Sequence, residues 1–348
     1  MLAADWSKQL FDVAQMRTIR YPLKEGNIED ATAKAVSEAI KAPIDALSQG
    51  DSPVFTSIKG YPTNPDPTAA STMKGVMADA AVLQGKIRAV RAIAKSSRMA
   101  AAKALAVETV NAHMAPSDAI SVMRLVKNCV DDKQDWAWLA DFTKKLPSTI
   151  ANIEEVRETY AFALANSGNV TEAIAKLEEL LALSGPTPER LGLLGGRYKR
   201  LFASAKEEDK AEFLKSAIDA YQRGMELDLN QYYCSSNLPR LYRVRNRKGD
   251  EDRAIAVSNL VVAACERAKK LGVADEWLRP TLLGAAFDAG DADKAEELAE
   301  EVADEGASRW KLDTMIADLE TSVRLVKDPS HRERLGSILA DLKRINAG

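Results

Sequence analysis

The sequence is poor in the residues that most often build catalytic and metal sites. It contains only two histidines and three cysteines among 348 residues. His113 and His331 are far apart, and neither lies near a cysteine at the spacing of a zinc site. A serine or cysteine nucleophile would therefore have almost no histidine to serve as its base. We expect a protein that is not an enzyme and that holds neither a metal nor a cofactor.

Disulfide bonds, membrane spans and signal peptides are not indicated either. Cys129, Cys234 and Cys265 are odd in number and widely spaced, which favours a reducing compartment. No apolar run is long enough to span a bilayer, and the acidic, amphipathic start is unlike a signal peptide. The sequence thus predicts a cytoplasmic protein without a membrane partner.

Excess charge of one sign is missing as well. The formal net charge is -3, with 46% hydrophobic and 28% charged residues, as in ordinary globular proteins. Such a balance gives no overall attraction to nucleic acid, so DNA binding is not expected. Recognition of a charged partner must come from local patches.

What the sequence does contain is a recurring pattern of helical hairpins. Leu194, Gly195 and Tyr198 match the first half of a tetratricopeptide unit, and Ala217 and Tyr221 match its second half. In this pattern small residues let two antiparallel helices approach closely, while larger residues fill the groove between them. The chain is therefore predicted to be mainly all-α, a tetratricopeptide-like α-α superhelix.

Four such units follow one another, with a divergent helical pair before them and two closing helices after them. Gly168 is predicted to form the turn of the first unit, and a polar insertion at 203–212 to separate the helices of the second. Pro239 falls in the first turn of a helix in the third, where its missing N–H costs little. The predicted units are 154–184, 188–230, 232–269 and 275–305.

The first 65 residues have a different character. A strand is predicted at 17–23, a helix at 28–47 and a second strand at 53–58, which together make a short α/β remnant or an irregular arm. Prolines make 61–68 a linker, and 69–113 reads as one long helix or a broken pair. The predicted domains are 1–65 (N-terminal α/β remnant or arm), 66–115 (long helical connector), 116–326 (repeat array) and 327–348 (C-terminal capping helix).

Several motifs around the insertion also resemble a known family. They are Gly195-Gly-Arg-Tyr-Lys-Arg-Leu-Phe202, Ala217-Ile-Asp-Ala-Tyr-Gln-Arg-Gly-Met-Glu226 and Tyr232-Tyr-Cys-Ser-Ser-Asn-Leu238. In their order they resemble the TRAFs-binding domain of apoptosis-signal-regulating MAP3 kinases and the bacterial tetratricopeptide sensor domains. The chain departs from that pattern at Arg200, where an acidic residue is usual, and at Ser235-Ser236, where Gly-Ile is usual.

The resemblance implies a signalling module. In the bacterial relatives it implies a sensor of a nucleotide-derived signal, and in the kinases a platform for protein partners. The segments Phe11–Tyr21 and Asp51–Phe55 also resemble the end of a Rossmann-like domain of the TIR or deoxyribosyltransferase type, most of which is absent here.

One cluster of polar residues stands out as a candidate binding site. First helices of stacked hairpins line the concave face of a superhelix, and residues three apart on a helix share a face. Arginine suits phosphate or carboxylate, and asparagine can orient a polar ligand. The candidate groove residues are Arg197, Lys199, Arg200, Asn237, Arg240 and Arg243.

These observations lead to one function hypothesis and two alternatives. We expect a binding or regulatory module that senses an acidic, nucleotide-like ligand or holds a protein partner in its groove. The alternatives are a plain protein scaffold, in which the basic cluster pairs with acidic neighbours along the array, and the remnant of a Rossmann-like effector fused to repeats. The sequence leaves the ligand and the oligomeric state open.

Overall fold

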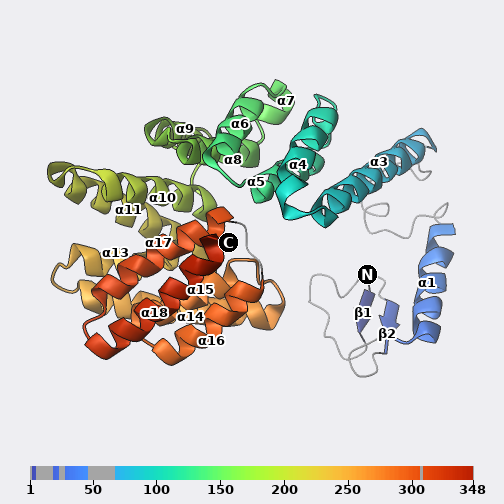
Figure 1. The fold of residues 1–348 in the computed structure, drawn as a ribbon. Coiled ribbons are helices and arrows are strands. Elements are labelled where there is room, and N and C mark those ends of the chain that lie inside the picture. The colour runs from blue at the N-terminus through green and yellow to red at the C-terminus, as the bar shows by residue number, and fades with distance from the viewer. Residues whose placement is uncertain (1, 5–18, 23–27, 46–66, 306–308, 348) are drawn as a thin grey trace. The chain divides into compact units, whose positions relative to one another are not determined.

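The computed structural model describes residues 2–4, 19–22, 28–45, 67–305 and 309–347 (Figure 1). The chain divides into two compact units, Met1–Val82 and Leu83–Gly348. In the first unit β1 (Leu2–Ala4) pairs in parallel with β2 (Ile19–Tyr21), and α1 (Asp30–Asp45) follows. β2 and α1 lie inside the segments predicted as strand and helix. The strand predicted at 53–58 and most of the linker at 61–68 lie outside the described residues.

The long helical segment is a broken pair. It consists of α3 (Pro67–Ala92) and α4 (Lys95–Thr109), and the Arg98 side chain donates a hydrogen bond to the Ile93 carbonyl between them. Pro67, assigned above to the linker, is instead the first residue of α3. A proline is tolerated there because the first N–H groups of a helix have no partner inside it.

The next helices form the first hairpins of the array. They are α5 (Pro116–Cys129), α6 (Lys133–Lys144), α7 (Ser148–Ala151), α8 (Glu154–Ser167) and α9 (Val170–Ser184). Gly168 forms the turn between α8 and α9 with φ 111°, as predicted, because glycine has no Cβ to clash there. α5 begins at Pro116, a position at which proline is favoured.

The insertion at 203–212 lengthens both helices of its hairpin. These helices are α10 (Pro188–Ser204) and α11 (Glu207–Leu227), and they pack closely against one another. The third unit begins with a short helix that the sequence did not predict, α12 (Tyr232–Ser235), and continues with α13 (Leu238–Arg245) and α14 (Asp250–Leu271). Pro239 lies in the first turn of α13, as predicted.

Four helices end the chain. They are α15 (Leu278–Ala289), α16 (Ala292–Asp304), α17 (Arg309–Leu325) and α18 (Pro329–Ala347). Their apolar faces share one core, which includes Phe287, Leu319 and Leu335. The described residues from Leu83 onward are thus an all-α array of hairpins, which confirms the predicted fold class. The closing helix α17 also reaches α13, and this contact is central to the site.

Candidate functional site

Two of the six groove residues, Lys199 and Arg240, meet at one carboxylate, that of Asp318 on α17, and a third, Asn237, contacts Lys199. Lys199 of α10 donates hydrogen bonds from Nζ to Asp318 Oδ1 at 2.8 Å and to Asn237 Oδ1 at 2.7 Å. Arg240 of α13 donates from Nη2 to Asp318 Oδ2 at 3.3 Å. Two neighbouring repeats therefore supply cations to an acidic residue that lies more than 70 residues further along the chain.

A second buried carboxylate completes this group. Arg240 Nη1 donates to Asp288 Oδ2 of α15 at 2.7 Å, and Ser322 Oγ of α17 donates to Asp288 Oδ1 at 2.6 Å. The Arg240 and Asp288 side chains are 8% and 3% exposed, so water contributes little to their solvation. We call Lys199, Asn237, Arg240, Asp288 and Asp318 the Asp318 cluster.

Two charges of this cluster, those of Arg240 and Asp318, are stabilised by their partners. Burial acts to lower the pKa of Arg240, but the carboxylates of Asp288 and Asp318 raise it by more, so the net shift is upward. Burial acts to raise the pKa of Asp318, and Lys199 and Arg240 lower it below its usual value. Both groups therefore remain charged around neutral pH.

Two other predicted residues lie at the margins of the cluster. Arg243 donates from Nη1 to the Asp288 carbonyl at 2.9 Å and pairs with Glu251 at 3.1 Å. Arg200 turns away, donating to the Ala165 carbonyl at 2.7 Å and to Asn166 Oδ1 at 2.8 Å. Its guanidinium therefore adds a second donor to a carbonyl in the last turn of α8, a favourable place for a cation.

The sixth predicted residue, Arg197, is buried without an acceptor. Its side chain lies against the Phe162 ring, with 4.9 Å from the guanidinium carbon to the ring centroid. Arg197 is 6% exposed, and its Nε and Nη1 atoms have no hydrogen-bond partner among the described residues. Burial lowers the pKa of this guanidinium. The structure thus separates Arg197 from the residues with which it was grouped.

Aromatic rings and further cations surround Arg197. Phe162 and Trp310 lie edge to face with centroids 5.4 Å apart, and Trp277 is 5.8 Å from Trp310. Lys127 Nζ is 4.4 Å from the Phe162 centroid, and Lys311 Nζ is 5.5 Å from that of Trp310. We call this group the Phe162 cluster; its members are Lys127, Phe162, Arg197, Trp277, Trp310 and Lys311.

The sequence analysis missed most of the Phe162 cluster. Neither Trp310 nor Lys127 is among the residues from which the groove was predicted. Trp136 fills the space between helices, with 5% exposure and a centroid 5.7 Å from that of Trp310. Aromatic residues make up only 6% of the chain. Trp310 lies in a helix rich in charged residues, and a tryptophan in such a helix was the one signal in the sequence for an unusual environment.

Glycines of α10 allow two tyrosine rings to approach this helix closely. A Cβ on Gly192 would lie 2.4 Å from the Tyr233 ring, and one on Gly195 would lie 2.8 Å from the Tyr221 ring. The glycine-rich segment at 192–196 is therefore a helix-packing surface. Tyr221 and Tyr233 lie near enough to Arg197 to influence the pKa of its guanidinium.

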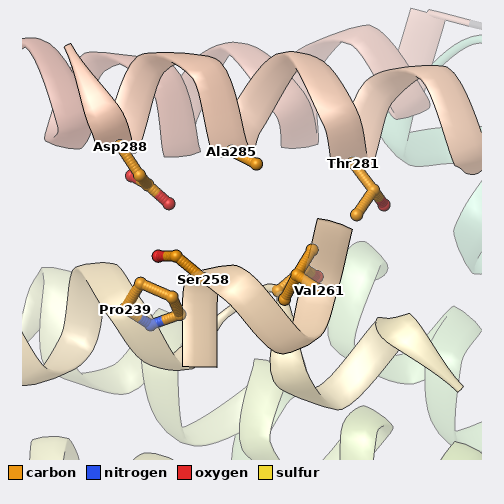
Figure 2. Close-up of a pocket in the computed structure, with 7 residues that line it drawn as sticks. Pro239, Ser258, Val261, Thr281, Ala285 and Asp288 are labelled. Carbon is orange, nitrogen blue, oxygen red and sulfur yellow. The ribbon is translucent and has the colours of Figure 1, made fainter. Parts of the chain in front are cut away.

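A small pocket lies beside the Asp318 cluster, between α13, α14 and α15 (Figure 2). In Figure 2 the carboxylate of Asp288 and the hydroxyl of Ser258 face one another across it. Its cavity volume is about 10 Å³, whereas ligand pockets are typically about 300–1,000 Å³. This pocket is too small for a nucleotide-sized ligand.

Within the described ranges, no group of three or more His, Cys, Asp or Glu residues is arranged to hold a metal ion. In the same part of the chain, none of the helices combines the length and the hydrophobicity needed to traverse a bilayer.

Comparisons with known proteins agree with the helical repeats. Residues 135–242, less than half of the chain, match the model of the family described as Tetratricopeptide Repeats-Sensor. Among curated proteins, none matches the sequence.

Two solved structures are among those similar to the chain. A thermophilic TPR protein of Thermus thermophilus has 15% identity and a TM-score of 0.40, covering 70% of this chain and 99% of that one. The human IFIT1 dimer with PPP-AAAA has 13% identity and a TM-score of 0.35, covering 73% of this chain and 64% of that one.

The matched residues contain the helices of the first two complete hairpins, α8 to α11, and further hairpins follow them. The resemblance to the kinase TRAFs-binding domain stays a prediction. Within residues 135–242 the chain is similar to the tetratricopeptide sensor family, and its helices there form hairpins of the tetratricopeptide type.

Proposed function

We propose that this chain is a non-enzymatic binding module whose α10 and α13 helices hold a carboxylate-bearing segment or ligand. One observation carries the proposal. Lys199 and Arg240, from consecutive repeats, both donate to the carboxylate of Asp318 on a third, distant helix. Charge-assisted bonds of this kind are strong and directional, so the pair is suited to capture an acidic group.

The way in which α17 packs supports an exchangeable occupant. The apolar face of α17 contributes Leu312, Met315 and Leu319 to the core shared with the other C-terminal helices. Its contacts with Lys199 and Arg240 are polar, and the Lys199 and Asp318 side chains are still 26% and 23% exposed. A competing carboxylate can therefore reach Lys199 without unfolding an apolar core.

The proposal assigns no reaction to the site. Asp288 and Asp318 are both occupied by cations, so neither is free to act as a base. The name of the matched family, which includes the word sensor, supports a regulatory role for the captured ligand. A nucleotide-like anion or an acidic peptide would satisfy the same donors.

A peptide-exchange experiment tests this function. The probe is a labelled synthetic peptide with the sequence of residues 309–325, and the readout is fluorescence polarisation with the full-length chain. Asp318→Asn in the chain removes the internal carboxylate, so we expect this variant to bind the peptide at least fivefold more tightly than the unmodified chain, by about 1 kcal/mol. Lys199→Gln added to Asp318→Asn should reverse the gain.

Two controls make the result specific. Asp313→Asn changes an exposed carboxylate of the same helix, which pairs with Asn346, and should leave peptide binding unchanged. A peptide in which Asn replaces Asp318 should bind weakly to every variant. Equal binding of the acidic and the neutral peptide to the Asp318→Asn chain would refute the proposal.

An exposed apolar face on α14 favours a second candidate, a plain scaffold. Ile255 and Val262 are 50% and 42% exposed and seven residues apart, which places them on one side of the helix. Leu271 and Val273 are exposed at the end of this helix. If the protein were only a scaffold, Ile255→Ser with Val262→Ser would abolish partner binding, and no anion would raise the melting temperature.

A further inference from the structure

The Phe162 cluster contains hydrogen-bond donors that have no acceptor. Arg197 Nε and Nη1 and Trp310 Nε1 are all buried without a partner among the described residues. Buried donors of this kind are rare in folded proteins, because they lose their bonds to water and gain none in return. Arg197 and Trp310 both lie against the Phe162 ring. Their unpaired donors therefore indicate a place where an acceptor belongs.

Stacking on Phe162 does not satisfy Arg197. The ring lies against the guanidinium, 4.9 Å from its central carbon. A guanidinium donates in its own plane, through N–H bonds that point outward from its edges. A cation–π contact therefore stabilises the charge but leaves the donors free. The edges of a guanidinium present pairs of parallel donors, the arrangement that binds two oxygens of one oxyanion.

The charges around the cluster also favour an anion. Lys127 forms no ion pair with any carboxylate in the described ranges, and its ammonium lies over the Phe162 and Trp310 rings. Lys311 pairs with Glu276 at 2.5 Å, and Glu189 is the other carboxylate that faces Arg197 and Lys127. Glu189 is exposed to solvent, so it offsets the buried positive charge only partly.

We propose that the Phe162 cluster is a binding site for a phosphate-type oxyanion, held by Arg197, Lys127 and Trp310. The Arg197 guanidinium donates to two of its oxygens, the indole N–H of Trp310 donates to a third, and the Lys127 ammonium supplies a second positive charge. Lys127 is only partly buried, so an anion can enter the site from the side on which Lys127 lies. This site is distinct from the Asp318 cluster, so the proposal does not depend on the proposed function.

Titration with simple anions tests this site. The probes are inorganic phosphate and phenyl phosphate, with chloride at equal ionic strength as the reference, and the readouts are isothermal titration calorimetry and tryptophan fluorescence. We expect both phosphate probes to bind the full-length chain and to change its fluorescence, because Trp310 is a ligand. Arg197→Gln should weaken binding at least tenfold, and Lys127→Gln should weaken it several-fold.

Matched variants distinguish this site from others. Arg223→Gln alters an exposed arginine of α11 and should leave phosphate affinity unchanged. Lys199→Gln separates this site from the Asp318 cluster: a loss of phosphate affinity as large as that from Arg197→Gln would place the anion at the Asp318 cluster and overturn the proposal. Absence of phosphate binding to the unmodified chain, equal effects of chloride, or undiminished binding by both Arg197→Gln and Lys127→Gln would each overturn the proposal. Tighter binding of phenyl phosphate than of phosphate would identify a phosphate ester as the occupant.

Discussion

Arg197 and Arg240 make an instructive comparison, because they are equally buried and have opposite surroundings. Each is 6% exposed, and each lies on a helix of consecutive repeats, α10 and α13. Arg240 donates to two carboxylates and a carbonyl, whereas the buried Nε and Nη1 atoms of Arg197 have no acceptor among the described residues. The net pKa shift is accordingly upward for Arg240 and downward for Arg197.

The difference shows that burial alone does not assign a role to a cation. A buried charge whose partners are all present holds helices together, here α13, α15 and α17. A buried charge with free donors stabilises the fold little and is available to a ligand. The stability of matched variants can test this distinction directly.

Replacing Arg240 should have the largest effect. Arg240→Met removes the cation between Asp288 and Asp318 and leaves the 3%-exposed carboxylate of Asp288 without its arginine. Removing one partner of a buried ion pair typically costs about 3–5 kcal/mol. We therefore expect the free energy of unfolding, measured by urea denaturation, to fall by about that amount.

A control on the surface calibrates this loss. Arg223→Met changes an exposed arginine and should shift the free energy of unfolding by less than about 0.5 kcal/mol. If Arg240→Met were as mild as Arg223→Met, the Asp318 cluster would not be a structural junction, and the contrast with Arg197 would disappear.

A smaller loss is expected when the packing beside Arg197 is disturbed. A Cβ on Gly195 would lie 2.8 Å from the ring of Tyr221, which is 1% exposed and has no room to move. Overpacking of this kind costs about 1–3 kcal/mol. Gly195→Ala should therefore lower the melting temperature in differential scanning calorimetry.

The matched control for this substitution is another helical glycine. Gly85 of α3 has no atom within 4 Å of its would-be Cβ. Gly85→Ala should stabilise the chain by about 0.5–1 kcal/mol, the ordinary gain of alanine over glycine in a helix. Equal effects of the two substitutions would show that Gly195 is not needed for the contact with Tyr221.

Much of the fold could be predicted from the sequence, because local rules determine it. Gly168 and Gly290 end helices with positive φ, and Pro239 starts one, all where glycine and proline are favoured. The hairpin pattern in α10 and α11 follows from the spacing of small and aromatic residues. The short helix α12 was missed, since a four-residue helix leaves no periodic signal.

The sites could be predicted only in part. Helical spacing grouped Lys199 with Arg197 and Arg200, but side chains two or three residues apart can still meet different neighbours. Their partners lie on other helices: Phe162 and Ala165 on α8, and Asp318 on α17. No rule of local sequence connects residues 119 positions apart, as Lys199 and Asp318 are.

Replacing Arg197 should change the free energy of unfolding least, in sharp contrast to replacing Arg240. Arg197→Met keeps an unbranched apolar stem against Phe162 and removes donors that have no acceptor, so the cost of burying them disappears. The lost cation–π contact opposes this gain by about 1–2 kcal/mol. We therefore expect the free energy of unfolding without added anion to stay within about 1 kcal/mol of its original value. A loss as large as that from Arg240→Met would mean that Arg197 has a structural partner after all, and the Phe162 cluster would then be a second junction, not a site.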